Sequence, residues 1–122
     1  WVINVPATNC SGLERLIASS FGHNVDVGAP GCQSIIYTTG VGTTLYVNFQ
    51  KTSAAAPHVS GVAGLLLSAG DIPGNIGTGA ALAPEDVEWV LQLSARDLTG
   101  PGIGYDLETG YGLLMRDKPW PT

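Results

Sequence analysis

A domain that combines short strands with two longer helices is the fold class that this sequence predicts. Three observations support this expectation. Residues 1–50 contain short runs rich in β-branched residues, interrupted by glycine and proline. Residues 53–69 are small or apolar on nearly every side of a helix. Residues 83–95 carry apolar side chains at helical spacing, which predicts a second, amphipathic helix.

The strands are expected in the first half of the chain. The run "WVINVPAT", residues 1–8, is typical of a strand broken by proline, and alternating valines before "GAPG" predict another strand over residues 24–27. Residues 33–50 form two β-rich runs around a glycine-containing loop at residues 40–42, which predicts a hairpin. Residues 11–22 have some helical spacing but are too short to assign.

The first helix is expected from Ser53 to Ala69, ending before Gly70. Because its residues are small or apolar nearly all round, we expect this helix to be buried on all sides. Pro57 falls within about its first turn, where a missing N–H costs little.

The second helix begins near Pro84, with acidic residues in its first turn. Its inward face is expected to carry Val87, Val90, Leu91 and Ser94. Glycine-rich loops are predicted on both sides of this helix, and residues 111–115 could start a last short helix.

Length and composition are consistent with one domain over residues 1–122, with no repeat or linker. A net charge of −5 disfavours a nucleic-acid partner, because no basic patch is available for phosphate contacts. No apolar run is long enough for a transmembrane helix, so no membrane partner is expected. The chain opens with Trp1 and its only methionine is Met115, so we expect it to be a piece of a longer precursor.

Ser53, at the start of the first helix, has two interpretations. Serine and threonine are favoured N-caps, so Thr52 or Ser53 could simply cap the helix. Alternatively, a serine at this position faces unpaired backbone N–H groups and the positive end of the helix dipole. Those donors could stabilise the oxyanion that forms when the hydroxyl attacks a carbonyl.

The segment "TSAAAPHVSGVAGLLLS", residues 52–68, strongly resembles the nucleophile segment of the subtilase (subtilisin-like) serine peptidases. In that family a Gly-Thr-Ser-x-Ala-Ala-Pro-His-Val segment opens the central helix. The match comprises Thr52, Ser53, Ala55, Ala56, Pro57, His58, Val59 and Gly61. Further segments resemble the family in the same order: residues 2–8, 24–31, 34–47, 82–95 and 108–115.

The resemblance implies an α/β fold, a subtilisin-like three-layer sandwich with a mainly parallel sheet, of which this chain supplies only the C-terminal part. It implies a serine endopeptidase in which Ser53 attacks the peptide carbonyl, with Thr52 and Lys51 near the oxyanion and the substrate. The family's catalytic Asp and His come from upstream segments that are absent here. The expected partners are therefore a polypeptide substrate and the N-terminal part of the same peptidase domain, and this chain by itself is expected to be inactive.

Neither histidine of the chain is expected to replace the missing base. His58 follows Ser53 by five positions and so points away from it by about 140°. The resemblance implies a structural role for His58, as for Pro57, while His23 is interpreted as a surface or turn residue. Asp26 is likewise interpreted as structural.

Lys51 departs from the family, which has glycine before Thr-Ser. Glycine there allows an unusual φ, so either the local backbone differs or the site is altered. The missing base and Lys51 keep a second hypothesis open, a non-catalytic pseudo-peptidase remnant that acts as a binding or structural piece.

No cofactor is expected. Structural calcium is possible by family, but acids such as Asp71 and Asp106 are scattered and give no ligand set. A secreted or secretory-pathway protein is expected, and in that case Cys10 and Cys32 are predicted to form a disulfide.

Overall fold

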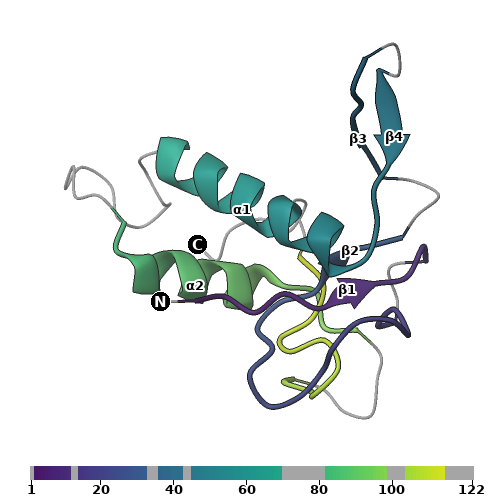
Figure 1. The fold of residues 1–122 in the computed structure, drawn as a ribbon. Coiled ribbons are helices and arrows are strands. Elements are labelled where there is room, and N and C mark those ends of the chain that lie inside the picture. The colour runs from purple at the N-terminus through teal and green to yellow at the C-terminus, as the bar shows by residue number, and fades with distance from the viewer. Residues whose placement is uncertain are drawn as a thin grey trace.

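The computed structural model describes residues 2–11, 14–32, 36–42, 45–69, 82–98 and 104–114. Four short strands precede two helices (Figure 1). The elements, in chain order, are β1 (Ala7–Thr8), β2 (Ala29–Pro30), β3 (Tyr37–Thr39), β4 (Tyr46–Asn48), α1 (Thr52–Ala69) and α2 (Pro84–Ser94).

The central strand pair is parallel. Strands β1 and β2 align Ala7 with Ala29 and Thr8 with Pro30, so the parallel pairing implied by the family resemblance is present. The expected strand over residues 24–27 is shifted toward the C-terminus, because the ladder with β1 begins only at Ala29. Val27 and Gly28 instead form isolated bridges with the C-terminal segment.

The predicted hairpin is confirmed. Strands β3 and β4 pair antiparallel, with Thr38 opposite Val47, and the hairpin projects away from the rest of the molecule beside the start of α1 (Figure 1). Its tyrosines, Tyr37 and Tyr46, are exposed.

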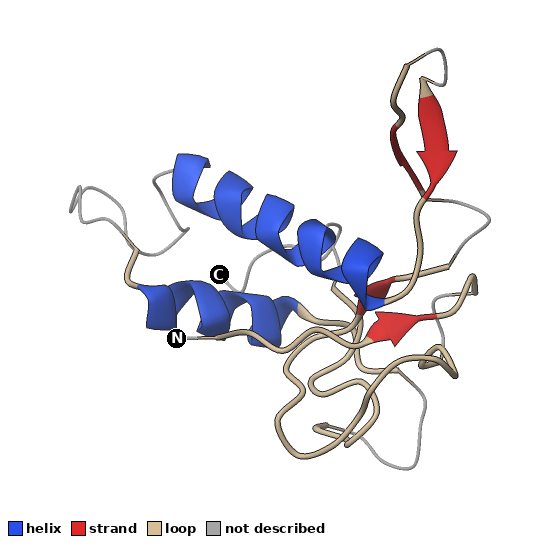
Figure 2. Ribbon diagram, in the orientation of Figure 1, coloured by secondary structure: helices blue, strands red, loops and turns tan. Residues whose placement is uncertain are grey.

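The helices lie side by side and run in opposite directions, and α1 also packs against β1 and β2 (Figure 2). The core between these elements consists of small and branched apolar side chains: Ala7, Val27, Ala29, Ala55, Val59, Leu66, Val87, Leu91 and Ala95. This core fixes the start of α1 against the end of β2.

The expectation that α1 is buried on all sides is wrong for the described part of the chain. Leu65 and Leu67 are 66% and 54% exposed, whereas Val59 and Leu66 are buried. The reason is geometric, because the strand pair and α2 cover one side of the helix and no other described element packs on the opposite side.

The amphipathic helix α2 is confirmed. Val87, Leu91 and Ser94 are buried on one face, and Val90 packs half-buried against the core. The Asp86 carboxylate accepts a hydrogen bond from the Ala83 N–H at 3.0 Å, which satisfies a donor at the helix start.

Two segments that could have been helical are not. Leu16 donates its N–H to the Ala7 carbonyl, and Arg15 forms an isolated antiparallel bridge with Thr8, so residues 14–21 lie beside β1 without forming a helix. The predicted helix over residues 111–115 is wrong up to Leu114, and Met115 lies outside the described residues. Leu113 bridges Gly28 and Arg96 instead, and this close backbone pairing excludes a helical turn.

No helix within the described residues combines the length and apolar character needed to span a membrane.

Candidate functional site

Lys51 forms the N-terminal boundary of α1. Its carbonyl accepts hydrogen bonds from the N–H groups of Ala54 and Ala55, at 3.0 and 3.1 Å. This pattern makes Lys51 the N-cap and places Thr52 and Ser53 at the first two helical positions. Neither hydroxyl makes a capping hydrogen bond within the described residues, so the simple capping role that the sequence left open is absent.

The backbone of Lys51 lies in the left-handed region, with φ 65°, and no other residue with a side chain has a positive φ in the described part of the chain. Lys51 therefore adopts a backbone conformation that is favourable for glycine and unfavourable for a residue with a side chain.

Gly31, which follows β2, fixes the position of Lys51. The Lys51 N–H donates to the Gly31 carbonyl at 2.7 Å. A Cβ atom on Gly31 would lie 2.7 Å from the Lys51 carbonyl oxygen and would overlap the Ala7 side chain. In the sequence, the only signal for this role of Gly31 is the Ala-Pro-Gly turn, which does not indicate a contact with Lys51.

Ser53 is exposed on the first turn of α1, while Ala54 and Ala55 beneath it are buried. The N–H groups of Thr52 and Ser53 have no acceptor among the described residues, as is usual at a helix start. The positive end of the helix dipole adds to these two donors. This arrangement can place a serine hydroxyl and oxyanion-stabilising donors against the same carbonyl group.

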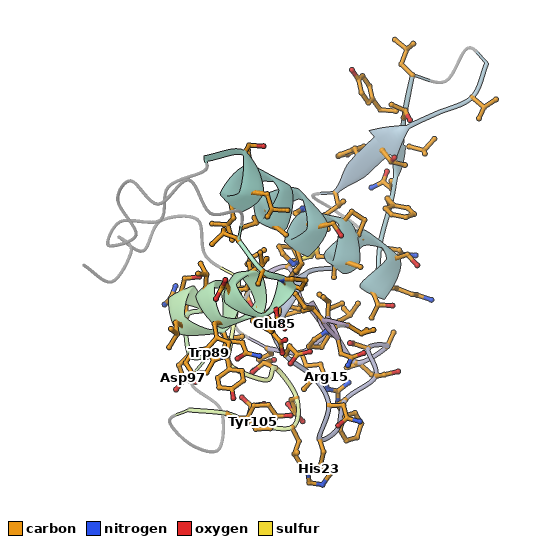
Figure 3. The ribbon with its side chains drawn as sticks, turned by 90° about the vertical axis from the view of Figure 1, so that its left-hand side faces the viewer. Arg15, His23, Glu85, Trp89, Asp97 and Tyr105 are labelled. Atoms are coloured by element: carbon orange, nitrogen blue, oxygen red, sulfur yellow. A yellow bond between two sulfur atoms is a disulfide. The ribbon has the colours of Figure 1, made fainter. Side chains whose placement is uncertain are left out.

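The two histidines do not approach Ser53. The Nδ1 atom of His58 lies 2.7 Å from the Ala54 carbonyl oxygen, one turn back on the same helix. His23 lies at the lower tip of the molecule near Tyr105, whose hydroxyl donates to the His23 carbonyl (Figure 3). Within the described residues, no hydrogen bond joins either imidazole ring to the Ser53 hydroxyl.

An open cavity of about 560 Å³ adjoins the start of α1. Its walls come from residues 4–6, residues 20–25 and Thr52, and none of these carries an Asp, Glu, Lys or Arg side chain. Phe21, one of the wall residues, stacks against the Arg15 guanidinium, which lies 4.5 Å from the ring centroid. The same guanidinium donates a hydrogen bond to the Ser19 carbonyl at 2.6 Å. Thr52 and His23 both line this cavity, whereas Ser53 is not among its lining residues.

Asp26 joins three parts of the chain. Its carboxylate accepts hydrogen bonds from the Asn4 N–H at 2.7 Å and from the Gln92 amide at 3.4 Å. Its backbone carbonyl accepts from the Tyr111 N–H at 2.8 Å. These contacts make Asp26 a structural residue, as its position in the sequence suggested.

Tyr105 lies beside this structural aspartate. Partial burial, followed by the negative charge of Asp26, raises the pKa of the Tyr105 hydroxyl above its usual value. The ring also packs edge-on against Tyr111, with 5.2 Å between the centroids. No sequence motif indicated that Tyr105 lies beside Asp26, and only the fold brings these two residues together.

Cys10 and Cys32 are joined by a disulfide, with 4.9 Å between their Cα atoms. They follow β1 and β2 respectively, so the bond ties together the two strands that support the start of α1.

Asp106, one of the two acids considered as calcium ligands, forms hydrogen bonds within its own loop. Asp106 already accepts hydrogen bonds from the Glu108 and Thr109 N–H groups and from the Thr109 hydroxyl, all at 2.7 Å. No group of three His, Cys, Asp or Glu side chains suited to a metal ion occurs in the described ranges. Asp71 lies outside them.

The sequence matches the model of the Subtilase family, peptidase S8, over residues 1–112. It is 39% identical to an extracellular protease of Xanthomonas campestris over 121 residues, which cover 95% of this chain and 19% of the relative. It is 35% identical to fervidolysin of Fervidobacterium pennivorans over 144 residues, covering 99% of this chain and 19% of that protein. The chain thus spans about a fifth of the length of these curated relatives.

Solved structures show the same relationship. The crystal structure of fervidolysin, a keratinolytic enzyme related to subtilisin, superposes with a TM-score of 0.70 and 31% identity over 99% of this chain and 20% of that chain. A lanthipeptide protease shares the fold, with a TM-score of 0.75 and 24% identity over 93% of this chain and 38% of that chain. The fold is therefore an α/β subtilisin-like arrangement, and the chain belongs to the subtilase family.

Proposed function

We propose that this chain is the nucleophile-bearing part of a subtilisin-like serine endopeptidase and that Ser53 is its nucleophile. One observation carries the proposal: Ser53 is exposed at the start of α1, beside two unpaired backbone N–H donors, within a subtilase-family sequence. Three of the curated relatives that it matches are named as proteases, which supports a polypeptide substrate.

In the proposed reaction, the Ser53 Oγ attacks the carbonyl carbon of a peptide bond while a histidine outside this chain accepts the hydroxyl proton. The N–H donors at the start of α1 stabilise the negative charge that develops on the carbonyl oxygen. The C–N bond then breaks, and the histidine returns the proton to the leaving amine. Water hydrolyses the acyl-enzyme and regenerates Ser53.

The N-terminal part of the same domain is the proposed partner that supplies this histidine and its aspartate. The exposed leucines on α1, Leu65 and Leu67, support this proposal because an additional layer of polypeptide would bury them. A secreted location is part of the proposal, and the extracellular names of two relatives support it.

The test uses an organofluorophosphonate probe, which labels activated serine nucleophiles. The protein that contains the N-terminal part should be labelled, and Ser53→Ala should abolish the label. Ser60→Ala is the matched control, because Ser60 is also exposed on α1 and its hydroxyl donates a hydrogen bond to the Ala56 carbonyl. The 122-residue chain alone should not be labelled, because it lacks a group that removes the serine proton.

The alternative is a pseudo-peptidase remnant, which Lys51 favours because the family has glycine at that position. A folded protein that contains the N-terminal part but neither labels at Ser53 nor cleaves peptides would establish this alternative and reject the proposed enzyme. Rapid labelling of the isolated chain, lost in Ser53→Ala, would instead show that a base within these residues serves Ser53.

A further inference from the structure

We propose that Lys51 makes this site select polypeptides with acidic side chains next to the scissile bond and discriminate against basic ones. The inference rests on the proposed role of Ser53 and names the substrate class of that same site. Glycine, the family residue, would leave the position without charge.

Lys51 lies close to the proposed nucleophile in the chain. Only Thr52 separates Lys51 from Ser53, so their Cα atoms lie within roughly 7 Å of each other, given 3.8 Å between consecutive Cα atoms. The carbonyl that Ser53 attacks must come within about 3 to 3.5 Å of its hydroxyl oxygen. The flexible four-carbon side chain of Lys51 can therefore approach substrate residues next to that carbonyl.

The ammonium group of Lys51 has no salt-bridge partner among the described residues. It is exposed, the first turn of α1 contains no acidic residue, and no salt bridge involves Lys51 within the described ranges. The cavity beside the helix start has no Asp, Glu, Lys or Arg in its walls. Lys51 therefore adds one positive charge beside the start of α1, whereas the whole chain has a net charge of −5.

The hydrogen bonds that Lys51 makes at the start of α1 come from its backbone and do not require its side chain. A side chain in the left-handed region is unfavourable, and Lys51 holds φ 65°. Its backbone provides the helix boundary and the hydrogen bond to Gly31, which glycine would provide equally well. The charged side chain of Lys51, which glycine lacks, makes no salt bridge within the described residues that could offset this strain. Strain without such compensation supports a role toward a ligand.

Two opposite charges at about 8 Å, close to the surface and partly screened, change a rate or binding constant by roughly 3-fold to 10-fold. The expected preference is therefore graded rather than absolute. Substrates with glutamate beside the scissile bond should be favoured over the glutamine analogues by this factor, and lysine analogues should be disfavoured. The preference should weaken at high ionic strength.

The experiment uses the protein that contains the N-terminal part and a series of internally quenched peptides. Each position flanking the scissile bond carries glutamate, glutamine or lysine in turn, and kcat and KM are measured at low and high salt. The variants are Lys51→Gln, which removes the charge, and Lys51→Arg, which keeps it. Arg96→Gln is the matched control, because Arg96 is another exposed cation, located beyond the end of α2.

We expect the glutamate preference to fall to about 1-fold in Lys51→Gln and to persist in Lys51→Arg and Arg96→Gln. An unchanged preference in Lys51→Gln, with Ser53 still labelled by the fluorophosphonate probe, overturns this inference alone. Absence of both labelling and peptide cleavage in the unmodified protein overturns the proposed function, and this inference with it.

Discussion

The backbone N–H of Lys51 donates a hydrogen bond to the Gly31 carbonyl at 2.7 Å, so the residue that begins α1 is held by the residue that follows β2. A side chain on Gly31 would press directly against the Lys51 carbonyl oxygen. That same carbonyl accepts the first hydrogen bonds of α1. The orientation of Ser53 therefore depends on a contact between two residues that lie 20 positions apart in the sequence.

Gly31→Ala is expected to destabilise the protein by about 3 kcal/mol, because the added Cβ meets backbone and a neighbouring Cβ that cannot move independently. Gly61→Ala is the control, since a Cβ there meets nothing within 4 Å and alanine favours helix by about 1 kcal/mol. Chemical denaturation measures both changes. Equal stability of the Gly31→Ala variant and the unmodified protein would show that the contact can relax.

Lys51→Gly is expected to raise the free energy of unfolding by about 0.5 to 1 kcal/mol. Relief of the left-handed strain exceeds the larger entropy that glycine loses on folding. Lys51→Ala should give no such gain, because alanine retains the Cβ atom that causes the strain. Denaturant midpoints of the three proteins provide the measurement, and a gain in Lys51→Ala equal to that in Lys51→Gly would rule out backbone strain as the cause.

The disulfide between Cys10 and Cys32 is expected to form in the mature protein and to contribute roughly 3 kcal/mol, from the entropy of a loop that joins residues 22 positions apart. Mass spectrometry after alkylation without reductant should find neither thiol modified. The stability difference should appear between the oxidised protein and a Cys10→Ser, Cys32→Ser variant. Two alkylated cysteines in the folded protein would contradict the prediction.

Tyr105 is expected to ionise above pH 10.0, the usual value for tyrosine, because partial burial and the carboxylate of Asp26 raise its pKa in the folded state. A raised folded pKa gives a stabilising contribution that is complete below pH 10.0 and is lost as the pH rises through the folded value. The phenolate absorbance of the unmodified protein minus that of Tyr105→Phe isolates this titration. A midpoint of the difference curve at or below pH 10.0 would contradict the assignment.

The local elements that depend on short-range patterns were predictable from the sequence. The hairpin followed from two β-rich runs around a glycine-containing loop, and α2 followed from Pro84 and its apolar face. The proposal that Ser53 is the nucleophile rests on the same kind of signal, because the residues that carry the family resemblance form one contiguous segment of the chain.

Other predictions failed where long-range pairing decides the conformation. The segment that ends in Leu114 has the composition of a short helix, but Leu113 pairs with both Gly28 and Arg96. Gly112 adopts φ 117°, and a side chain there would overlap the Arg96 carbonyl group. Backbone hydrogen bonds to two distant segments outweigh the weak helical propensity of four residues.

The sequence by itself determined the family, the order of the elements and the residue types at the start of α1, because each of these is encoded in contiguous residues. Only the tertiary structure decided that Lys51 adopts the left-handed conformation, that Gly31 holds it there and that one side of α1 is left uncovered by the described elements. The physical reason is that backbone conformation and burial at these positions depend on contacts between segments far apart in the chain.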